Sequence, residues 1–265
     1  MRCLIAIFAM ALWSPAHSSG VIENESAAEL AVIVQMLDAP AKRVNILEFK
    51  SRREHHAYLA ESRGETESLD EYLERHAEFA RFGQPATDAE IAGLKALSKA
   101  AIPPALEAFY REMGSFGGGR GMRNLTIAHP AAFADAHRSD LRPLRSIGLI
   151  DVLRSGPWGH LQLFDTASGE GLTPDQVSVL NDRYSVCAWR FVEETEGREY
   201  LYFDRAGRFG LLLFHQDHIE DFHSGALLPM VESSPATDSL ATALRKLVKG
   251  SISDPECGPP PRDSC

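Results

Sequence analysis

The chain has 265 residues, 44% of them hydrophobic, and a formal net charge of −10 at pH 7. This length and composition suit one sizeable folded domain with extensions, or two small domains, and they exclude an intrinsically disordered chain. The acidic balance argues against a nucleic-acid-binding protein, because such proteins present an excess of Lys and Arg to the phosphates.

Residues 1–20 have the order of a short secretory signal. Arg2 precedes an apolar run over residues 4–13, and Ala16-His17-Ser18 offers a cleavage site. The run is too short for a permanent membrane-spanning helix, so no integral membrane segment is expected after signal removal. The alternative is a buried N-terminal helix. The protein is therefore expected to be exported if the signal is real, and cytoplasmic otherwise.

Residues 21–84 are predicted to form a helical N-terminal extension. Apolar residues first recur at the spacing of one helical stripe, at Leu30, Ile33, Val34 and Leu37. The sequence Asp38-Ala39-Pro40 is expected to end that helix, because Pro breaks a helix interior. The highly charged residues 44–82 keep a helical spacing of apolar residues, which predicts one or two surface helices.

Two helices are predicted to begin the main domain, residues 85–249. Thr87 and Glu90 match a capping box, in which each side chain satisfies a backbone N–H at the start of a helix. In the next helix Pro104 suits the first turn, and Gly114 suits the left-handed conformation that ends it. A continuous helical face is formed by Leu106, Phe109, Tyr110 and Met113.

The second half of the chain has the shorter hydrophobic period of strands. Runs separated by Gly, Pro, Asp and Asn predict a mainly antiparallel sheet from residues 124–127, 147–153, 159–164, 185–193, 200–204 and 209–215. Asp204 and Gly207 mark a hairpin turn between the last two runs. Residues 239–248 are predicted as a closing helix and residues 250–265 as a disordered tail, in which Cys257 and Cys265 could pair after export. This order predicts an α+β fold with helices before and after the sheet.

The order of these elements resembles the SUKH superfamily. The most specific part is Ile102-Pro103-Pro104-Ala105-Leu106-Glu107-Ala108-Phe109-Tyr110, between the capped helix and a Gly-rich loop. The superfamily contains fungal cell-wall assembly regulators and bacterial proteins that resemble immunity proteins. The resemblance implies an α+β fold, no catalytic residues, no cofactor, and a function in covering a partner protein such as a toxin.

Two acidic segments are predicted to form a rim that attracts a basic partner such as a toxin domain, because complementary charge speeds association. They contain Glu193, Glu194 and Glu196 in one segment, and Asp217, Glu220 and Asp221 in the other. The alternative for both segments is a solvated loop. Trp158, near a Gly-Pro turn, is a candidate interface anchor or a core residue.

The alternative function is an exported metal-binding protein or hydrolase that uses His215, His218 and His223. Neither a regular helix nor a strand would point all three rings at one centre, so a solvated polar loop is the simpler interpretation. The Gly-rich residues 115–121 are predicted to be a connector, because they follow a helix and carry no Lys for a phosphate. Cys187 lies in an apolar run and is predicted to be a buried hydrophobe.

Overall fold

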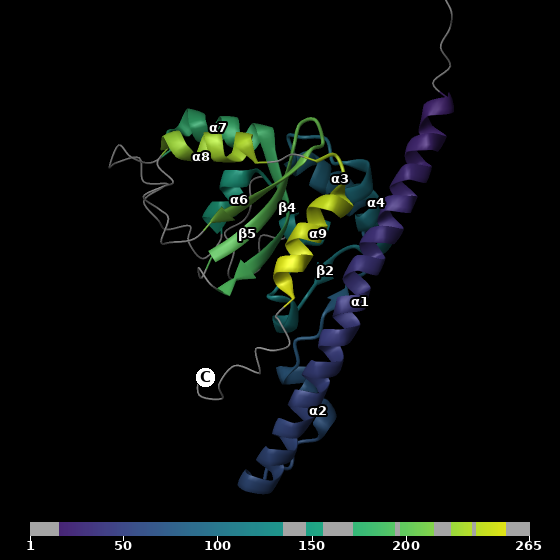
Figure 1. Ribbon diagram of the computed structural model, residues 1–265, viewed down its shortest axis with the longest axis vertical. Coiled ribbons are helices and arrows are strands. Elements are labelled where there is room, and N and C mark those ends of the chain that lie inside the picture. The colour runs from purple at the N-terminus through teal and green to yellow at the C-terminus, as the bar shows by residue number, and fades with distance from the viewer. Residues whose placement is uncertain are drawn as a thin grey trace, which may run out of the picture.

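The computed structural model describes residues 16–134, 147–155, 172–193, 197–214, 224–234 and 237–252. Figure 1 shows an α+β chain, as predicted: a sheet with helices before and after it, and one long N-terminal helix. The predicted signal segment lies largely outside the described residues, as do the strand predicted for residues 159–164 and the tail after residue 252.

The sheet has six strands in the order β1-β2-β3-β4-β5-β6, and all neighbours are antiparallel. The strands are β1 (Arg81–Phe82), β2 (Phe116–Gly117), β3 (Thr126–Ile127), β4 (Tyr184–Val192), β5 (Gly197–Asp204) and β6 (Phe209–Phe214). The last three confirm the predicted strands and hairpin. At the turn, Asp204 Oδ1 accepts hydrogen bonds from the backbone N–H groups of Ala206 and Arg208, both at 2.9 Å, and Gly207 has a φ of 78°.

The described helices are α1 (Ala16–Arg63), α2 (Leu69–His76), α3 (Asp88–Leu97), α4 (Pro104–Met113), the 3-10 turn η1 (Arg120–Met122), α5 (Pro130–Ala134), α6 (Leu149–Ser155), α7 (Pro174–Arg183), α8 (Ser224–Ser233) and α9 (Leu240–Ser251). Helices α3, α4 and α9 confirm three predictions. The capping box is formed, because Thr87 Oγ1 accepts from the Glu90 N–H at 3.3 Å and Glu90 Oε2 accepts from the Thr87 N–H at 2.7 Å. Gly114 ends α4 with a φ of 66°.

Two predictions about helix and strand boundaries are wrong. Helix α1 does not stop at Asp38-Ala39-Pro40, since Pro40 lies inside it. An interior Pro costs about 3 kcal/mol, and burial of Leu37 and Ala41 on the core side of the same helix offsets that cost. The predicted strand at residues 147–153 is instead occupied largely by α6, whose N–H groups at Ile150 and Asp151 donate to Asn181 Oδ1 on α7 at 2.8 and 3.1 Å. This cap comes from a distant helix, so the local sequence does not show it.

The sheet lies between two groups of helices with separate cores. Along β5, Leu201 and Phe203 pack with α1, α3, α4 and α9, whereas Tyr200 and Tyr202 pack with α6, α7 and α8. The alternation follows from the two-residue period of a strand. In Figure 1, α9 crosses β4 and β5 on one side, and α6, α7 and α8 gather on the other.

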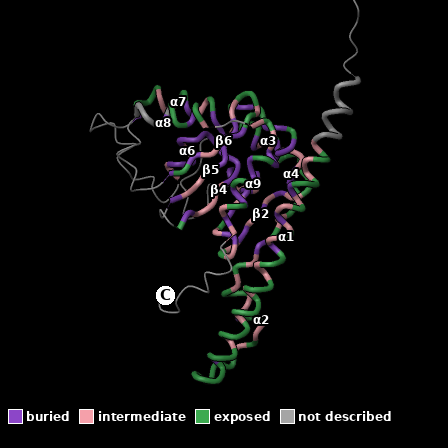
Figure 2. Tube along the Cα trace, in the orientation of Figure 1, coloured by how far each residue is buried: buried purple, intermediate pink, exposed green. Residues whose placement is uncertain are grey.

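Helix α1 joins the main core and then extends beyond it. Ile33 and Leu37 are fully buried in the core shared with α4 and α9. Glu29 Oε1 also accepts hydrogen bonds from Ser239 Oγ at 2.7 Å and from the Ala241 N–H at 2.9 Å, at the start of α9. The predicted extension is therefore part of the core over this stretch. Figures 1 and 2 show that the rest of α1, with α2 beside it, projects past the sheet and is mostly exposed; we call residues 46–76 the arm.

Candidate interaction surfaces

Most of the predicted site residues lie outside the described residues. Glu193 is described, and it is exposed directly after β4. The residues outside the description are Trp158, Glu194, Glu196, Asp217, Glu220, Asp221, His215, His218, His223, Cys257 and Cys265. The acidic rim, the tryptophan anchor and the histidine cluster therefore stay predictions.

Arg190 lies near the end of β4, three residues before Glu193. Its Nε donates to Glu199 Oε2 on β5 at 2.7 Å, and its Nη1 donates to the Gly250 carbonyl oxygen of α9 at 2.7 Å. A cation at this position complements the partial negative charge at the C-terminal end of a helix. Arg190 thus fastens α9 to the sheet, and its donors serve the fold.

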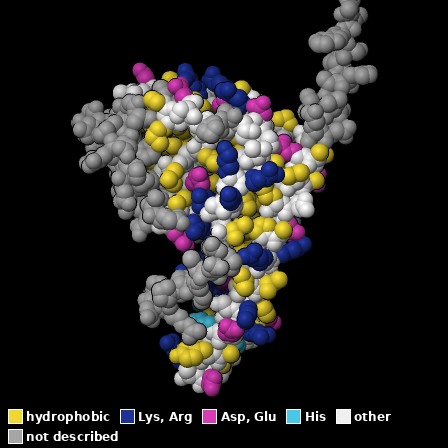
Figure 3. Space-filling model, in the orientation of Figure 1, with side chains coloured by type: hydrophobic (Ala, Val, Ile, Leu, Met, Phe, Trp, Pro, Cys, Tyr) yellow, Lys and Arg dark blue, Asp and Glu magenta, His cyan; other side chains and the backbone are white. Residues whose placement is uncertain are grey.

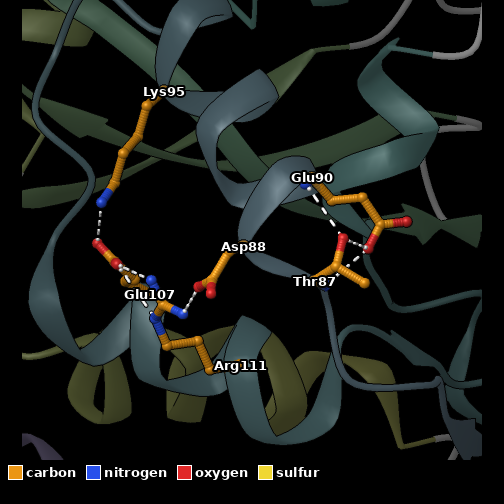
Figure 4. A network of polar contacts seen from close by, with 6 residues as sticks. All are labelled: Thr87, Asp88, Glu90, Lys95, Glu107 and Arg111. Carbon is orange, nitrogen blue, oxygen red and sulfur yellow. Dashed lines mark hydrogen bonds and ion pairs between the residues drawn. The ribbon is translucent and has the colours of Figure 1, made fainter.

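A second polar cluster joins α3 to α4 (Figure 4). Arg111 Nη1 lies 2.5 Å from Asp88 Oδ1, Arg111 Nη2 lies 2.9 Å from Glu107 Oε1, and Lys95 Nζ lies 2.8 Å from Glu107 Oε2. Burial raises the pKa of the Glu107 carboxyl, but the hydrogen bonds from Lys95 and Arg111 outweigh burial, so the pKa falls below its ordinary value. Each acid faces a cation, so this cluster fixes the two helices against each other.

Cys187 confirms the prediction of a buried hydrophobe. Its thiol is 1% exposed and lies 3.6 Å from the Leu201 carbonyl oxygen. Burial raises the pKa of the Cys187 thiol far above its ordinary value, which keeps the thiol protonated and unreactive. Within the described residues, no group of three or more His, Cys, Asp or Glu side chains could hold a metal ion.

The Gly-rich residues 115–121 have a structural role that their sequence shows only in part. Gly119 has a φ of 56°, and a Cβ there would overlap the Glu78 carbonyl oxygen. A Cβ at Gly121 would lie 2.9 Å from Val44 Cβ on α1. The glycines therefore let this connector pack closely against α1 and against the segment before β1.

The arm is held together by polar and aromatic contacts between α1 and α2. Tyr72 of α2 is buried, and its hydroxyl shares a hydrogen bond of 2.7 Å with His55 Nδ1. A further hydrogen bond of 2.8 Å joins His56 Nε2 to the Glu67 carbonyl oxygen. Asn45, at the base of the arm, donates to the Ala80 carbonyl oxygen at 2.8 Å and accepts from the Ala80 N–H at 2.7 Å. These contacts fix the orientation of the side chains that α1 presents on its other side.

Large apolar side chains are exposed along α1. Among the described residues, five of the eight exposed large hydrophobic side chains lie on this helix: Val32, Ile46, Leu47, Phe49 and Tyr58. Ile46 is the most exposed, at 70%. Figure 3 shows hydrophobic side chains at the surface of the lower part of the molecule, with basic, acidic and histidine side chains among them. Grouped exposed hydrophobic residues mark interaction surfaces more often than scattered ones do.

No protein-family model, curated protein or solved structure matches the chain. None of the helices in the described ranges has the length and apolar character needed to cross a membrane. The described residues thus form an α+β fold whose long N-terminal helix exposes large apolar side chains.

Proposed function

We propose that the chain is a non-enzymatic protein-interaction protein of the SUKH type, which binds a partner protein and covers its active face as an immunity protein covers a toxin. The observation that carries this proposal is the row of exposed large apolar side chains on α1. Water contact with such side chains is unfavourable, and a partner that covers them removes that penalty.

The arm suits binding because it is already ordered. Ile33 and Leu37 anchor the middle of α1 in the core, and Tyr72 anchors α2 to the C-terminal part of α1 through its hydrogen bond with His55. A preformed surface loses little conformational entropy when a partner binds. Phe49 and Tyr58 are the aromatic residues among the exposed large hydrophobic side chains of the arm, and aromatic residues often provide much of the energy of an interface.

The acidic residues around Glu193 complete the proposal as a second contact. Glu193, Glu194 and Glu196 would meet a basic part of the partner, together with Asp217 and Asp221. Charge on this rim would steer the partner, whereas the apolar side chains of α1 would hold it. The partner would then have one basic region and one region that covers α1.

The test uses the full chain and the polypeptides encoded by its neighbouring genes, with binding measured by isothermal titration calorimetry. We expect a stoichiometric complex that Ile46→Asp with Phe49→Asp weakens at least about tenfold, or about 1.4 kcal/mol. The matched control is Val179→Asp with Met230→Asp, which changes two exposed apolar side chains on α7 and α8. The proposal fails if no neighbouring polypeptide binds, or if both double variants bind as the unmodified chain does.

A further inference from the structure

The outward side of α1 carries a regular stripe of apolar residues. Val32, Ala39 and Ile46 follow one another at intervals of seven residues, and Phe49 comes three residues after Ile46. All four are exposed. In a heptad of this register Val32, Ala39 and Ile46 take the a positions and Phe49 takes a d position, whereas Gln35 and Lys42 take the two earlier d positions. The apolar contact is therefore concentrated at Ile46 and Phe49. Because the core residues Ile33, Leu37 and Ala41 occupy the opposite side of α1, the stripe is open to a second helix.

Positive charge flanks the stripe. Arg43, Lys50 and Arg53 are exposed around Ile46, and none of them has an ion-pair partner within the described residues. Two neighbouring charges are already engaged: Lys42 Nζ lies 2.7 Å from Asp38 Oδ2, and Arg52 Nε lies 2.8 Å from Glu48 Oε1. Residues 42–54 carry five cations against two acids, Glu48 and Glu54, so this stretch of α1 is locally basic although the whole chain is acidic. Unpaired cations beside an apolar stripe favour a ligand that is locally acidic.

We infer that the outward stripe of α1, defined by Val32, Ala39, Ile46 and Phe49, docks an acidic amphipathic helix of the partner protein. The apolar side of that helix packs on Ile46 and Phe49, and its carboxylates face Arg43, Lys50 and Arg53. This inference rests on the proposed protein-binding function and adds the chemistry of the partner at the same surface.

A second copy of the chain fits the stripe poorly. A parallel two-fold pairing would place each cation of the stripe against its own copy. An antiparallel pairing centred on Ile46 would bring Lys42 and Arg43 of one chain close to Lys50 and Arg53 of the other, because these cations lie on both sides of Ile46. Like charges in such positions oppose association.

An anionic bilayer is also disfavoured, because the whole chain is strongly acidic. The net charge of −10 repels a negatively charged surface at long range, and the arm itself adds Asp70, Glu71 and Glu74 on α2. An acidic helix brings its carboxylates close to Arg43, Lys50 and Arg53, and its small size limits this repulsion. A partner helix is therefore the occupant that the charges favour.

The test titrates the full chain with two synthetic peptides, each about four heptads long, with Leu at the a and d positions. One peptide has Glu at every e and g position and the other has Lys. We expect the Glu peptide to bind at least about tenfold more tightly than the Lys peptide. Ile46→Asp with Phe49→Asp should weaken this binding about tenfold or more, whereas Val179→Asp with Met230→Asp should leave it unchanged.

A charge-reversed variant, Arg43→Glu with Lys50→Glu and Arg53→Glu, should prefer the Lys peptide. Circular dichroism and thermal unfolding check that each variant is folded. The inference is overturned by equal affinity for the two peptides, or by Glu-peptide binding that Ile46→Asp with Phe49→Asp leaves intact. Binding to phosphatidylglycerol vesicles and self-association in sedimentation equilibrium are measured as well. The inference is also overturned if the chain binds the vesicles or associates with itself and does not bind the Glu peptide.

The two proposals fail separately. If a neighbouring polypeptide binds through Ile46 and Phe49 but the Glu peptide does not, the acidic helix is wrong and the protein-binding function stands. If no neighbouring polypeptide binds, the proposed function fails, even where the stripe accepts the Glu peptide.

Discussion

Replacing Leu37 with Ala tests whether α1 is part of the fold. Leu37 is 0% exposed and shares a core with α4 and α9. Leu37→Ala removes three buried carbon atoms, worth about 0.8 kcal/mol each in transfer free energy, or about 2.4 kcal/mol together. The cavity left behind raises the expected loss of unfolding free energy to about 3–4 kcal/mol, within the usual range for such a change.

Ile46→Ala is the matched control on the same helix. Ile46 is 70% exposed, so truncation removes little buried area, and we expect a change within about 0.5 kcal/mol. Urea unfolding followed by circular dichroism and by tryptophan fluorescence measures both variants. At about 2 to 4 °C for each kcal/mol, Leu37→Ala should also lower the melting temperature by about 6–16 °C. A Leu37→Ala variant as stable as Ile46→Ala would show that α1 is a detached appendage and would refute the packing described above.

Gly93→Ala and Gly114→Ala should shift the free energy of unfolding, measured in urea, in opposite directions. Gly93 lies in α3 beside open space, so Ala there should raise the free energy of unfolding by about 0.5–1 kcal/mol. Gly114 has a φ of 66° and a Cβ there would overlap a backbone carbonyl, so Gly114→Ala should lower it by more than about 1 kcal/mol. Glu107→Gln should lower the free energy of unfolding at pH 7, because a carboxyl whose pKa is lowered in the folded state stabilises the fold above its unfolded pKa. The difference between the variant and the unmodified chain should shrink as the pH falls below about 4.3, since Glu107 then becomes protonated. Burial raises the pKa of Tyr202 to about 12, so Tyr202→Phe should remove one phenol from the late part of an ultraviolet absorbance titration, and the contribution of Tyr202 to stability should fall as the pH rises from about 10 towards 12. Metal analysis of protein purified without a histidine tag should find less than one zinc ion per chain, and stoichiometric zinc that is lost on mutating residues 215–223 would instead support the metal-binding alternative.

Local signals in the sequence were sufficient for the elements that local interactions define. The capping box at Thr87 and Glu90 and the hairpin turn at Asp204 and Gly207 each act within a few residues, and each is formed. The run at residues 147–153 was misassigned because short apolar strands and short buried helices have similar sequences. The decisive contact comes from Asn181, which caps α6 from a helix about 30 residues later.

The exposed apolar side of α1 was hard to predict because its exposure also depends on contacts between distant parts of the chain. Helix α1 carries apolar residues on two sides, and sequence periodicity does not show which side meets the core. Tertiary contacts bury Ile33 and Leu37 and leave Ile46 and Phe49 exposed. The charged composition around Ile46 did predict a surface helix, but the stripe on that surface becomes visible only once the buried side is known.

The hydrogen bonds of Glu29 to Ser239 and to the Ala241 N–H bear on how the protein forms during synthesis. Helix α1 emerges from a ribosome about 200 residues before α9, with which it shares a core, and this interval is about 10 to 40 s of translation. Throughout that interval the buried side of α1 lacks the part of its cover that α9 provides, so its apolar side chains are exposed to aggregation until α9 is made. A stop codon before residue 239 would remove α9 and leave α1 with its contacts to α4, so truncations that reach into α9 should reduce the yield of folded protein.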